Sequence, residues 1–283
     1  MKIAISAEST IDLTPELIEK YDIKVVQFTI NLGEESFLDK DISPKNIFEF
    51  VDKTKTLPKT SAVNTFQFQE HFESLLKDYD AVIHFSLSSE ISSACENAKI
   101  ASEKFNNVFV IDTRSLSTSI ALLALSAYDL IKKGLTAKEI FEKIKRRVYF
   151  VQASFVLDRL DYLYKGGRCN ALVYFGANLL KLHPQILVKD GKMTSGHKYR
   201  GGLEKVTLDY VNDTLKEFNN PDKKRVFITY TTSTESLTSQ IENILKDKGF
   251  QEIYKTTAGA TISSHCGENT LGILYINDGG NAF

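Results

Sequence analysis

The chain has 283 residues, of which 42% are hydrophobic and 25% charged, and its formal net charge is −1. This balance is typical of a globular protein and excludes a disordered chain, while the length suits two domains. The sequence has no basic block that could neutralise a phosphate backbone, which argues against a nucleic-acid partner.

Strand and helix patterns alternate through the first half of the chain. The pattern predicts strands at residues 3–6, 26–30, 81–85 and 108–111, and helices that begin at Thr14-Pro15, Ser43-Pro44, near Phe68 and at Thr136. The run 81–85 is apolar throughout, as expected for a strand covered by helices on both faces. This order predicts an α/β domain over residues 1–150, with a mainly parallel sheet flanked by helices.

The second half of the chain has a different pattern. Gly166 and Gly167 end a short helix, and Asp190-Gly191 is a favoured two-residue hairpin turn. Further strands at 226–230 and 271–276 flank a helix at 236–246. We predict a second domain over residues 151–283, a mixed α/β layer packed closely on the first, because no linker-like segment separates the two.

Several kinds of site lack their motifs in this chain. No GxGxxG follows a strand and no GxxxxGK[ST] occurs, so no nucleotide site is visible. The five histidines and the cysteines Cys95, Cys169 and Cys266 lack the spacing of metal or disulfide sites, so we expect no cofactor. The longest uncharged run, 115–128, is shorter than the roughly 20 apolar residues of a membrane span. We therefore expect a cytoplasmic protein without membrane insertion.

Hydroxyl side chains gather in two predicted loops. Thr60 and Ser61 precede a helix, and Ser92 and Ser93 end a serine-rich turn directly after the strand at 81–85. Loops at the carboxyl edge of a parallel sheet commonly bind ligands, and the helix that follows Ser93 would point its N-terminal amide groups at an anion. The alternative is that these serines only cap helices and form turns.

Six short motifs follow one another along the chain. They are Ile3-Ala-Ile-Ser-Ala-Glu-Ser-Thr10, Pro58-Lys-Thr-Ser61, Ser88-Ser-Glu-Ile-Ser-Ser93, Ile111-Asp-Thr113, Leu160-Asp-Tyr-Leu-Tyr-Lys-Gly-Gly-Arg168 and Ser264-His-Cys-Gly267. In this order they resemble the bacterial DegV family over essentially the whole chain, and the segment at 160–168 is the most specific. Glu8 stands where that family usually has Asp, and Gly267 to Thr270 replace a Gly-Pro-Gly-Ala type of loop.

The resemblance implies a non-catalytic protein that binds one long-chain fatty acid. The residues that it implies for the carboxylate are Thr60, Ser61, Ser92, Ser93 and His265, with Arg168 and Arg200 nearby. In some family members the bound carboxylate is presented to a separate ATP-binding fatty acid kinase subunit. A kinase subunit of that kind is therefore the implied partner.

The uncharged stretch 171–180 is our candidate for the acyl tunnel in the second domain. Leu172, Phe175 and Leu179 would share one face of a helix, although an ordinary core helix would show the same pattern. Each buried methylene contributes about 0.8 kcal/mol, so about fifteen of them contribute on the order of 10 kcal/mol before entropy is counted. The tail would then dominate the affinity and the head group would set the orientation.

Two other functions stay open. A serine hydrolase would use Ser92 as nucleophile, His265 as base and Asp112 to orient the base, although no GxSxG elbow marks Ser92. A lipid carrier or sensor without a kinase partner would use the same residues as the kinase subunit.

Overall fold

The computed structural model describes residues 1–168 and 182–280. Cys169 and the predicted tunnel residues Leu172, Phe175 and Leu179 lie outside these ranges. Among the described residues, the chain forms two packed α/β domains, and none of their helices is long and apolar enough to cross a membrane.

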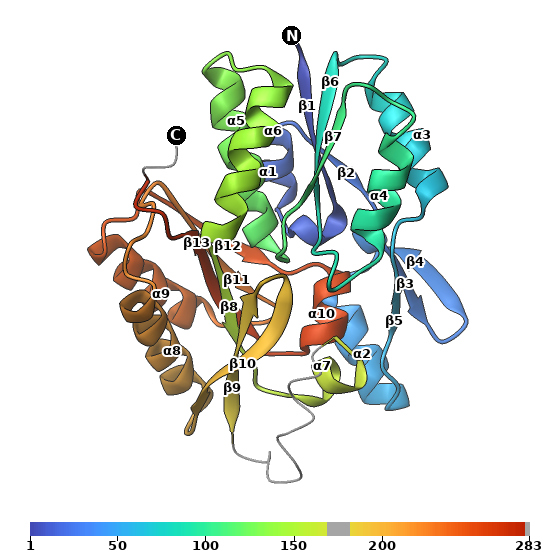
Figure 1. Ribbon diagram of the computed structural model, residues 1–283. Helices are drawn as coiled ribbons and strands as arrows, with labels where there is room; N and C mark the ends of the chain where they lie inside the picture. The colour runs from blue at the N-terminus through green and yellow to red at the C-terminus, as the bar shows by residue number, and fades with distance from the viewer. Residues whose placement is uncertain (169–181, 281–283) are drawn as a thin grey trace.

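The first domain is built on a four-stranded sheet in which every neighbouring pair is parallel. Its strands, in spatial order, are β2 (Ile23–Val26), β1 (Ile3–Glu8), β6 (Ala81–Ser86) and β7 (Val108–Asp112). All residues of β1 and β6 are buried, because helices cover both faces of the sheet (Figure 1). The predicted parallel sheet with flanking helices is confirmed.

Six helices belong to this domain. They are α1 (Pro15–Lys20), α2 (Pro44–Thr54), α3 (Thr65–Leu75), α4 (Ala94–Ser102), α5 (Thr118–Lys132) and α6 (Ala137–Arg147). Helices α2 and α6 start with capping boxes at Ser43 and Thr136, as their sequences indicate. The domain also has three short 3-10 helices, of which the last leads into the second domain. They are η1 (Ser9–Ile11), η2 (Asp39–Asp41) and η3 (Val148–Phe150).

The single strand predicted over residues 26–30 is wrong. The chain leaves the parallel sheet after Val26 and enters a small antiparallel sheet at Thr29. That sheet has the order β4 (Glu35–Leu38), β3 (Thr29–Leu32), β5 (Lys59–Ser61). Alternating apolar residues predict which side chains are buried, but they do not tell which sheet a strand joins. Phe28 lies at the break and is buried.

The second domain has a six-stranded mixed sheet. Its strands, in spatial order, are β10 (Lys192–Tyr199), β9 (His183–Lys189), β8 (Val151–Val156), β13 (Leu271–Ile276), β11 (Arg225–Tyr230) and β12 (Glu252–Thr257). Only β11 and β12 pair in parallel. The hairpin predicted at Asp190-Gly191 is confirmed, because β9 and β10 meet there.

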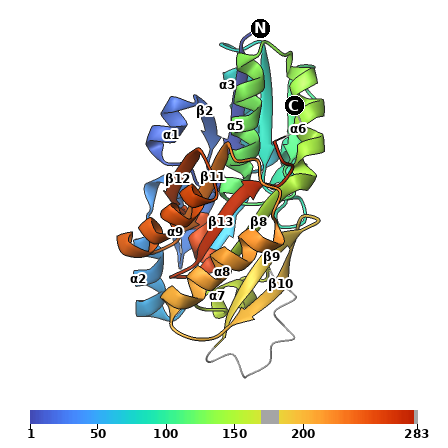
Figure 2. The same cartoon turned by 90° about the vertical axis from the view of Figure 1, so that its left-hand side faces the viewer.

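Helices α8 (Leu203–Glu217) and α9 (Glu235–Asp247) lie on one face of this sheet, as Figures 1 and 2 show. Two short helices, α7 (Asp161–Lys165) and α10 (Ala260–Cys266), contact each other, and α10 also contacts α2 of the first domain. Helix α10 therefore carries second-domain residues to the boundary with the first domain.

Helix α5 packs between the two sheets. It contacts β1 and β6 of the first sheet and β8, β11 and β13 of the second. Most of its residues are buried, which explains the uncharged run at 115–128 as a core helix.

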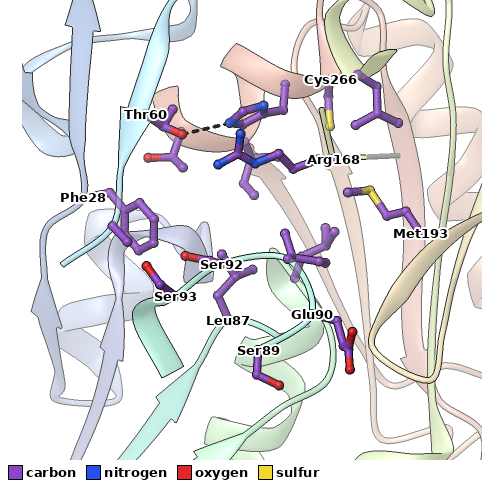
Figure 3. Close-up of a pocket in the computed structure, with 17 residues that line it drawn as sticks. Phe28, Thr60, Leu87, Ser89, Glu90, Ser92, Ser93, Arg168, Met193 and Cys266 are labelled. Carbon is purple, nitrogen blue, oxygen red and sulfur yellow. Dashed lines mark hydrogen bonds between the residues drawn. The ribbon is translucent and has the colours of Figure 1, made fainter. Parts of the chain in front are cut away.

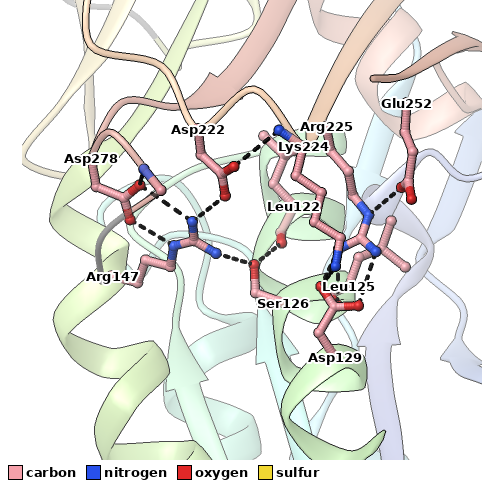
Figure 4. A network of polar contacts seen from close by, with 11 residues as sticks. Leu122, Leu125, Ser126, Asp129, Arg147, Asp222, Lys224, Arg225, Glu252 and Asp278 are labelled. Carbon is pink, nitrogen blue, oxygen red and sulfur yellow. Dashed lines mark hydrogen bonds and ion pairs between the residues drawn. The ribbon is translucent and has the colours of Figure 1, made fainter. Parts of the chain in front are cut away.

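Two arginines form ion pairs between the domains (Figure 4). Arg147, at the end of α6, pairs with Asp222 and Asp278, and its Nε lies 2.8 Å from Asp278 Oδ2. Arg225 of β11 reaches Asp129 of α5 at 2.6 Å, and also Glu252 of β12 at 2.6 Å. Both guanidinium groups are nearly buried, so these pairs resist screening by salt.

Candidate functional site

A pocket of about 420 Å³ lies where the two domains meet. Its lining comes from the small sheet, the turn after β6, α7, β10 and α10. The polar lining residues include Thr60, Ser92, Ser93, Arg168 and His265, and the apolar ones include Phe28, Leu87, Ile91, Leu116, Leu163 and Met193. Figure 3 shows Thr60 and Arg168 close together, with Met193 and Cys266 on the other side.

Thr60 and His265 form a hydrogen bond across the pocket wall. Thr60 Oγ1 lies 2.9 Å from His265 Nε2. Burial, with a smaller effect of the Arg168 charge, lowers the pKa of His265 to about 4, so the ring is neutral at neutral pH.

The surroundings of the ring select one tautomer of His265. Its Nδ1 is buried and has no hydrogen-bond partner among the described residues, and a Cβ on Gly166 would lie only 2.7 Å from it. A buried N–H without an acceptor is more unfavourable than a buried acceptor without a donor, so the proton belongs on Nε2. Thr60 Oγ1 then accepts from His265, and the hydroxyl hydrogen of Thr60 stays available for a ligand.

The hydroxyl hydrogen of Ser92 is also available for a ligand, for a different reason. Its Oγ accepts a hydrogen bond from the backbone N–H of Ala94 at 3.2 Å, so its own hydrogen stays available to donate. Ser93 is the N-cap residue of α4, but its side chain makes no capping hydrogen bond. Thr60 and Ser92 thus supply two hydroxyl donors to one pocket.

Two carboxylates hold the turn that carries Ser92. Buried Glu8, at the end of β1, accepts from the N–H of Leu87 at 2.9 Å. Asp112, at the end of β7, accepts from the N–H of Ser89 at 3.3 Å and from its hydroxyl at 2.6 Å. The turn is therefore anchored to the strands on both sides of β6.

The remaining predicted site residues lie as follows. Arg168 lines the pocket and donates to the carbonyl of Gly166 at 2.9 Å. Ser61 is exposed, accepts from Asn31, and is not a lining residue, because alternate residues of β5 point in opposite directions. Arg200 is exposed beyond the end of β10 and does not line the pocket either.

Sequence reasoning missed most of the apolar wall. Phe28, Leu87, Leu163 and Met193 come from four separate segments, and no local motif marks them as neighbours. Two of them had a signal nearby, since Leu87 precedes the serine turn and Leu163 lies within the motif at 160–168.

The described residues do not assemble a hydrolase triad. His265 hydrogen-bonds Thr60 rather than Ser92, and Asp112 binds Ser89 and the N–H of Arg114 rather than the imidazole. The described residues also contain no group of His, Cys, Asp and Glu that could hold a metal ion.

A second, smaller cavity of about 30 Å³ adjoins the pocket. It shares Leu116, Ile262 and Cys266 with the pocket and reaches Phe155 and Leu274 of the second sheet. Its serine and threonine neighbours have hydrogen-bond partners, as with Thr229, which pairs with Thr118, so this extension is largely apolar.

Comparison with known proteins places this site in a family. Residues 2–278 match the family described as "Uncharacterised protein, DegV family". A DegV domain-containing protein of Caldanaerobacter subterraneus is 30% identical over 280 residues, which cover 97% of this chain and 98% of the relative.

Solved structures agree with the sequence match. A DegV family protein from Thermus thermophilus, described by its fatty acid binding, is 26% identical with a TM-score of 0.88, covering 98% of this chain and 100% of that one. The linoleic acid-loaded Fatty Acid Kinase (Fak) B3 protein of Streptococcus pneumoniae shares the fold at 21% identity and a TM-score of 0.84, with coverages of 98% and 100%. The chain belongs to the DegV family.

Proposed function

We propose that this protein binds one long-chain fatty acid, with its carboxylate at Thr60 and Ser92 and its acyl tail against the apolar wall. The observation that carries the proposal is that the hydroxyl groups of Thr60 and Ser92 line one pocket. Both can donate to a ligand, because Ser92 accepts from Ala94 and Thr60 accepts from the Nε2–H tautomer of His265. The Thermus relative, which is described as binding fatty acid, supports the same ligand class.

The polar side of the pocket favours an anion, because the acidic lining residue Glu90 is paired with Lys192 at 3.2 Å while the other groups are donors. A carboxylate taken out of water is destabilised by several kcal/mol unless its oxygens receive hydrogen bonds. Thr60 and Ser92 would donate one hydrogen bond each, and the exposed Arg168 adds a positive charge to the same lining. The neutral His265 would act on the ligand through Thr60 rather than by its own charge.

The acyl tail would lie against Phe28, Leu163 and Met193 and extend toward the small apolar cavity at Leu116 and Ile262. We also propose Leu172, Phe175 and Leu179 as contacts farther along the tail. These three follow Arg168 closely in the chain, and Arg168 lines the pocket.

We further propose a separate ATP-binding kinase subunit as the partner, with this protein as the subunit that presents the carboxylate. Family membership supports this step, and so does the exposure of the polar side. Ser93 and Arg168 are exposed and Thr60 and Ser92 are only half-buried, so another protein could approach the head group. The lipid carrier or sensor without a kinase is the alternative.

The test begins with the lipid that copurifies with the protein. Organic extraction and mass spectrometry should find one long-chain fatty acid per chain. Titration of lipid-free protein should show tighter binding of the acid than of its methyl ester, since the ester keeps the tail and lacks the anion. A protein that carries no acyl lipid and binds acid and ester equally would refute the proposal. Acyl phosphate formation with ATP and a kinase subunit separates the presenting subunit from a carrier.

A further inference from the structure

The tip of the β9–β10 hairpin, residues 190–192, touches the turn that carries Ser92. The hydroxyl of Ser88 donates to the carbonyl of Gly191 at 2.7 Å, in a buried position. The guanidinium of Arg114 donates to the carbonyl of Asp190 at 2.6 Å. The tip of a second-domain hairpin is therefore fixed to two loops of the first domain by its backbone.

Gly191 fits this contact because it has no side chain. Its φ is +83°, and a Cβ there would lie 2.8 Å from Ser88 Oγ and 3.2 Å from Glu90 Cγ. Any other residue would push the tip away from the turn and would also strain the backbone. The nearby pair of Lys192 and Glu90, 3.2 Å apart, is largely exposed and adds little.

Ser88 is the centre of the turn. It is fully buried, and its carbonyl accepts from the N–H groups of Ile91 at 2.9 Å and of Ser92 at 3.1 Å. Its own N–H donates to the carbonyl of Ser115 at 3.0 Å. A displacement of Ser88 would therefore move the backbone of Ser92 directly.

The hairpin also forms part of the opposite wall. Met193, two residues after Gly191, lines the pocket. Among the described residues, β10 is an edge strand that pairs only with β9, and its register with β9 is irregular between Ser195 and Lys198. The contact between Ser88 and Gly191 thus joins the wall that carries Met193 to the turn that carries Ser92.

We propose that Ser88 and Gly191 are positioning residues that determine selectivity for the head group. Their contact holds Ser92 where its hydroxyl meets a carboxylate, so the closed contact favours the acid over a neutral ester with the same tail. This inference rests on the proposed fatty-acid binding. It assigns head-group selectivity to a hairpin tip that lines no part of the pocket itself.

The first test is Gly191→Ala, with Gly134→Ala as its matched control. Gly134 has a φ of +82°, but nothing lies within 4 Å of a Cβ there, so the control has the same backbone strain without the collision. In Gly191→Ala we expect the affinity for the acid to fall about tenfold, which corresponds to the loss of one hydrogen bond. The affinity for the methyl ester should fall by less than about threefold. The control should change neither affinity.

The second test removes the hydrogen bond without adding bulk. Ser88→Ala deletes the hydroxyl that donates to the carbonyl of Gly191 and introduces no collision. Like Gly191→Ala, it should lower the affinity for the acid more than the affinity for the methyl ester.

A Gly191→Ala variant that folds and keeps the wild-type ratio of acid to ester affinity would overturn the inference. A folded Ser88→Ala variant that keeps the wild-type ratio would do the same, and this variant serves alone if Gly191→Ala does not fold. A wild type that binds acid and ester equally would instead refute the proposed fatty-acid function.

Discussion

Thr60 Oγ1 lies 2.9 Å from His265 Nε2, although 205 positions separate the two residues in the chain. Thr60 belongs to a three-residue strand of the first domain, and His265 to a short helix of the second. With its proton on Nε2, the neutral imidazole donates to Thr60 and leaves the hydrogen of the Thr60 hydroxyl free. A histidine of the second domain thus leaves a hydroxyl of the first domain free to donate to a ligand.

Removal of either hydroxyl should weaken binding of the acid without removing it. Thr60→Val and Ser92→Ala each delete one charge-assisted hydrogen bond, about 1.5–3 kcal/mol, which is roughly ten- to a hundredfold in affinity. The apolar contacts of the tail are unchanged, so the methyl ester should lose little. Displacement of a fluorescent fatty acid gives both affinities, and equal losses for acid and ester would mean that the substitutions disturb the tail instead.

His265 and Thr60 should act as one unit. His265→Ala should lower the affinity for the acid by about as much as Thr60→Val, and the double variant should lose little more than either single one. Four titrations complete this double-mutant cycle. Additive losses would show that the imidazole contacts the ligand independently of Thr60.

Gly166 should be needed for the position of His265. In Gly166→Ala, the new Cβ would lie 2.7 Å both from Nδ1 of the imidazole and from the backbone carbonyl oxygen of Tyr162. The ring and the end of α7 must therefore shift apart, and the bond of the ring to Thr60 should weaken. We expect a several-fold loss of affinity for the acid, measured by the same displacement assay. Gly167→Ala is the control: its φ of +69° strains the backbone, but nothing lies within 4 Å, so stability should fall and affinity should not.

The packing of the two domains should depend on the pair of Asp129 and Arg225. Burial opposes ionisation of Asp129, but hydrogen bonds from Arg225 and Lys224 outweigh it and lower the pKa of the carboxyl. Asp129→Ala would leave the guanidinium nearly buried with one partner fewer, and should reduce the free energy of unfolding by roughly 3–5 kcal/mol. Urea unfolding measures the change. Glu49→Ala, which breaks an exposed pair with Lys45, should change it by less than about 1 kcal/mol.

Local patterns in the sequence predicted the elements that local interactions determine. The apolar run at 81–85, the capping residues Ser43 and Thr136 and the turn at Asp190-Gly191 each fix the backbone within a few residues, and the structure contains all of them. Thr60 and Ser92 both line the pocket, in agreement with the motifs that mark them, and Ser92 also follows a buried strand.

Long-range relationships could not be predicted in this way. Nothing near Phe28 shows that the chain changes sheets there, and nothing near Met193 shows that it faces the serine turn. The uncharged run at 115–128 showed an apolar segment, but not that α5 packs between two sheets. Such contacts depend on how separate elements pack, which periodicity within one element does not describe.

Asp12 gives the protein a distinctive dependence of stability on pH. Burial, its largest influence, and the nearby charge of Asp39 raise the pKa of Asp12 to about 8, against hydrogen bonds from Ser117 and from the N–H of Gly259. The ordinary value is 3.8, so between about pH 4 and pH 8 the folded chain keeps a proton that the unfolded chain has already lost. This contribution to stability is fully present below the ordinary pKa and is lost as the pH rises through about 8.

Asp12→Asn should remove that dependence. Through its Oδ1, an asparagine can still accept from the N–H of Gly259. Its amide group replaces the oxygen that accepts from the Ser117 hydroxyl, which can turn to accept from the amide instead, and the side chain stays neutral at every pH. We therefore expect the melting temperature of the wild type to fall between pH 5 and about pH 8, and that of Asp12→Asn to fall less over this interval. Differential scanning calorimetry at several pH values makes the comparison, with the exposed Asp78→Asn as the control that should follow the wild type. Parallel curves for wild type and Asp12→Asn would show that Asp12 is ionised in the folded protein and that its two donors outweigh its burial.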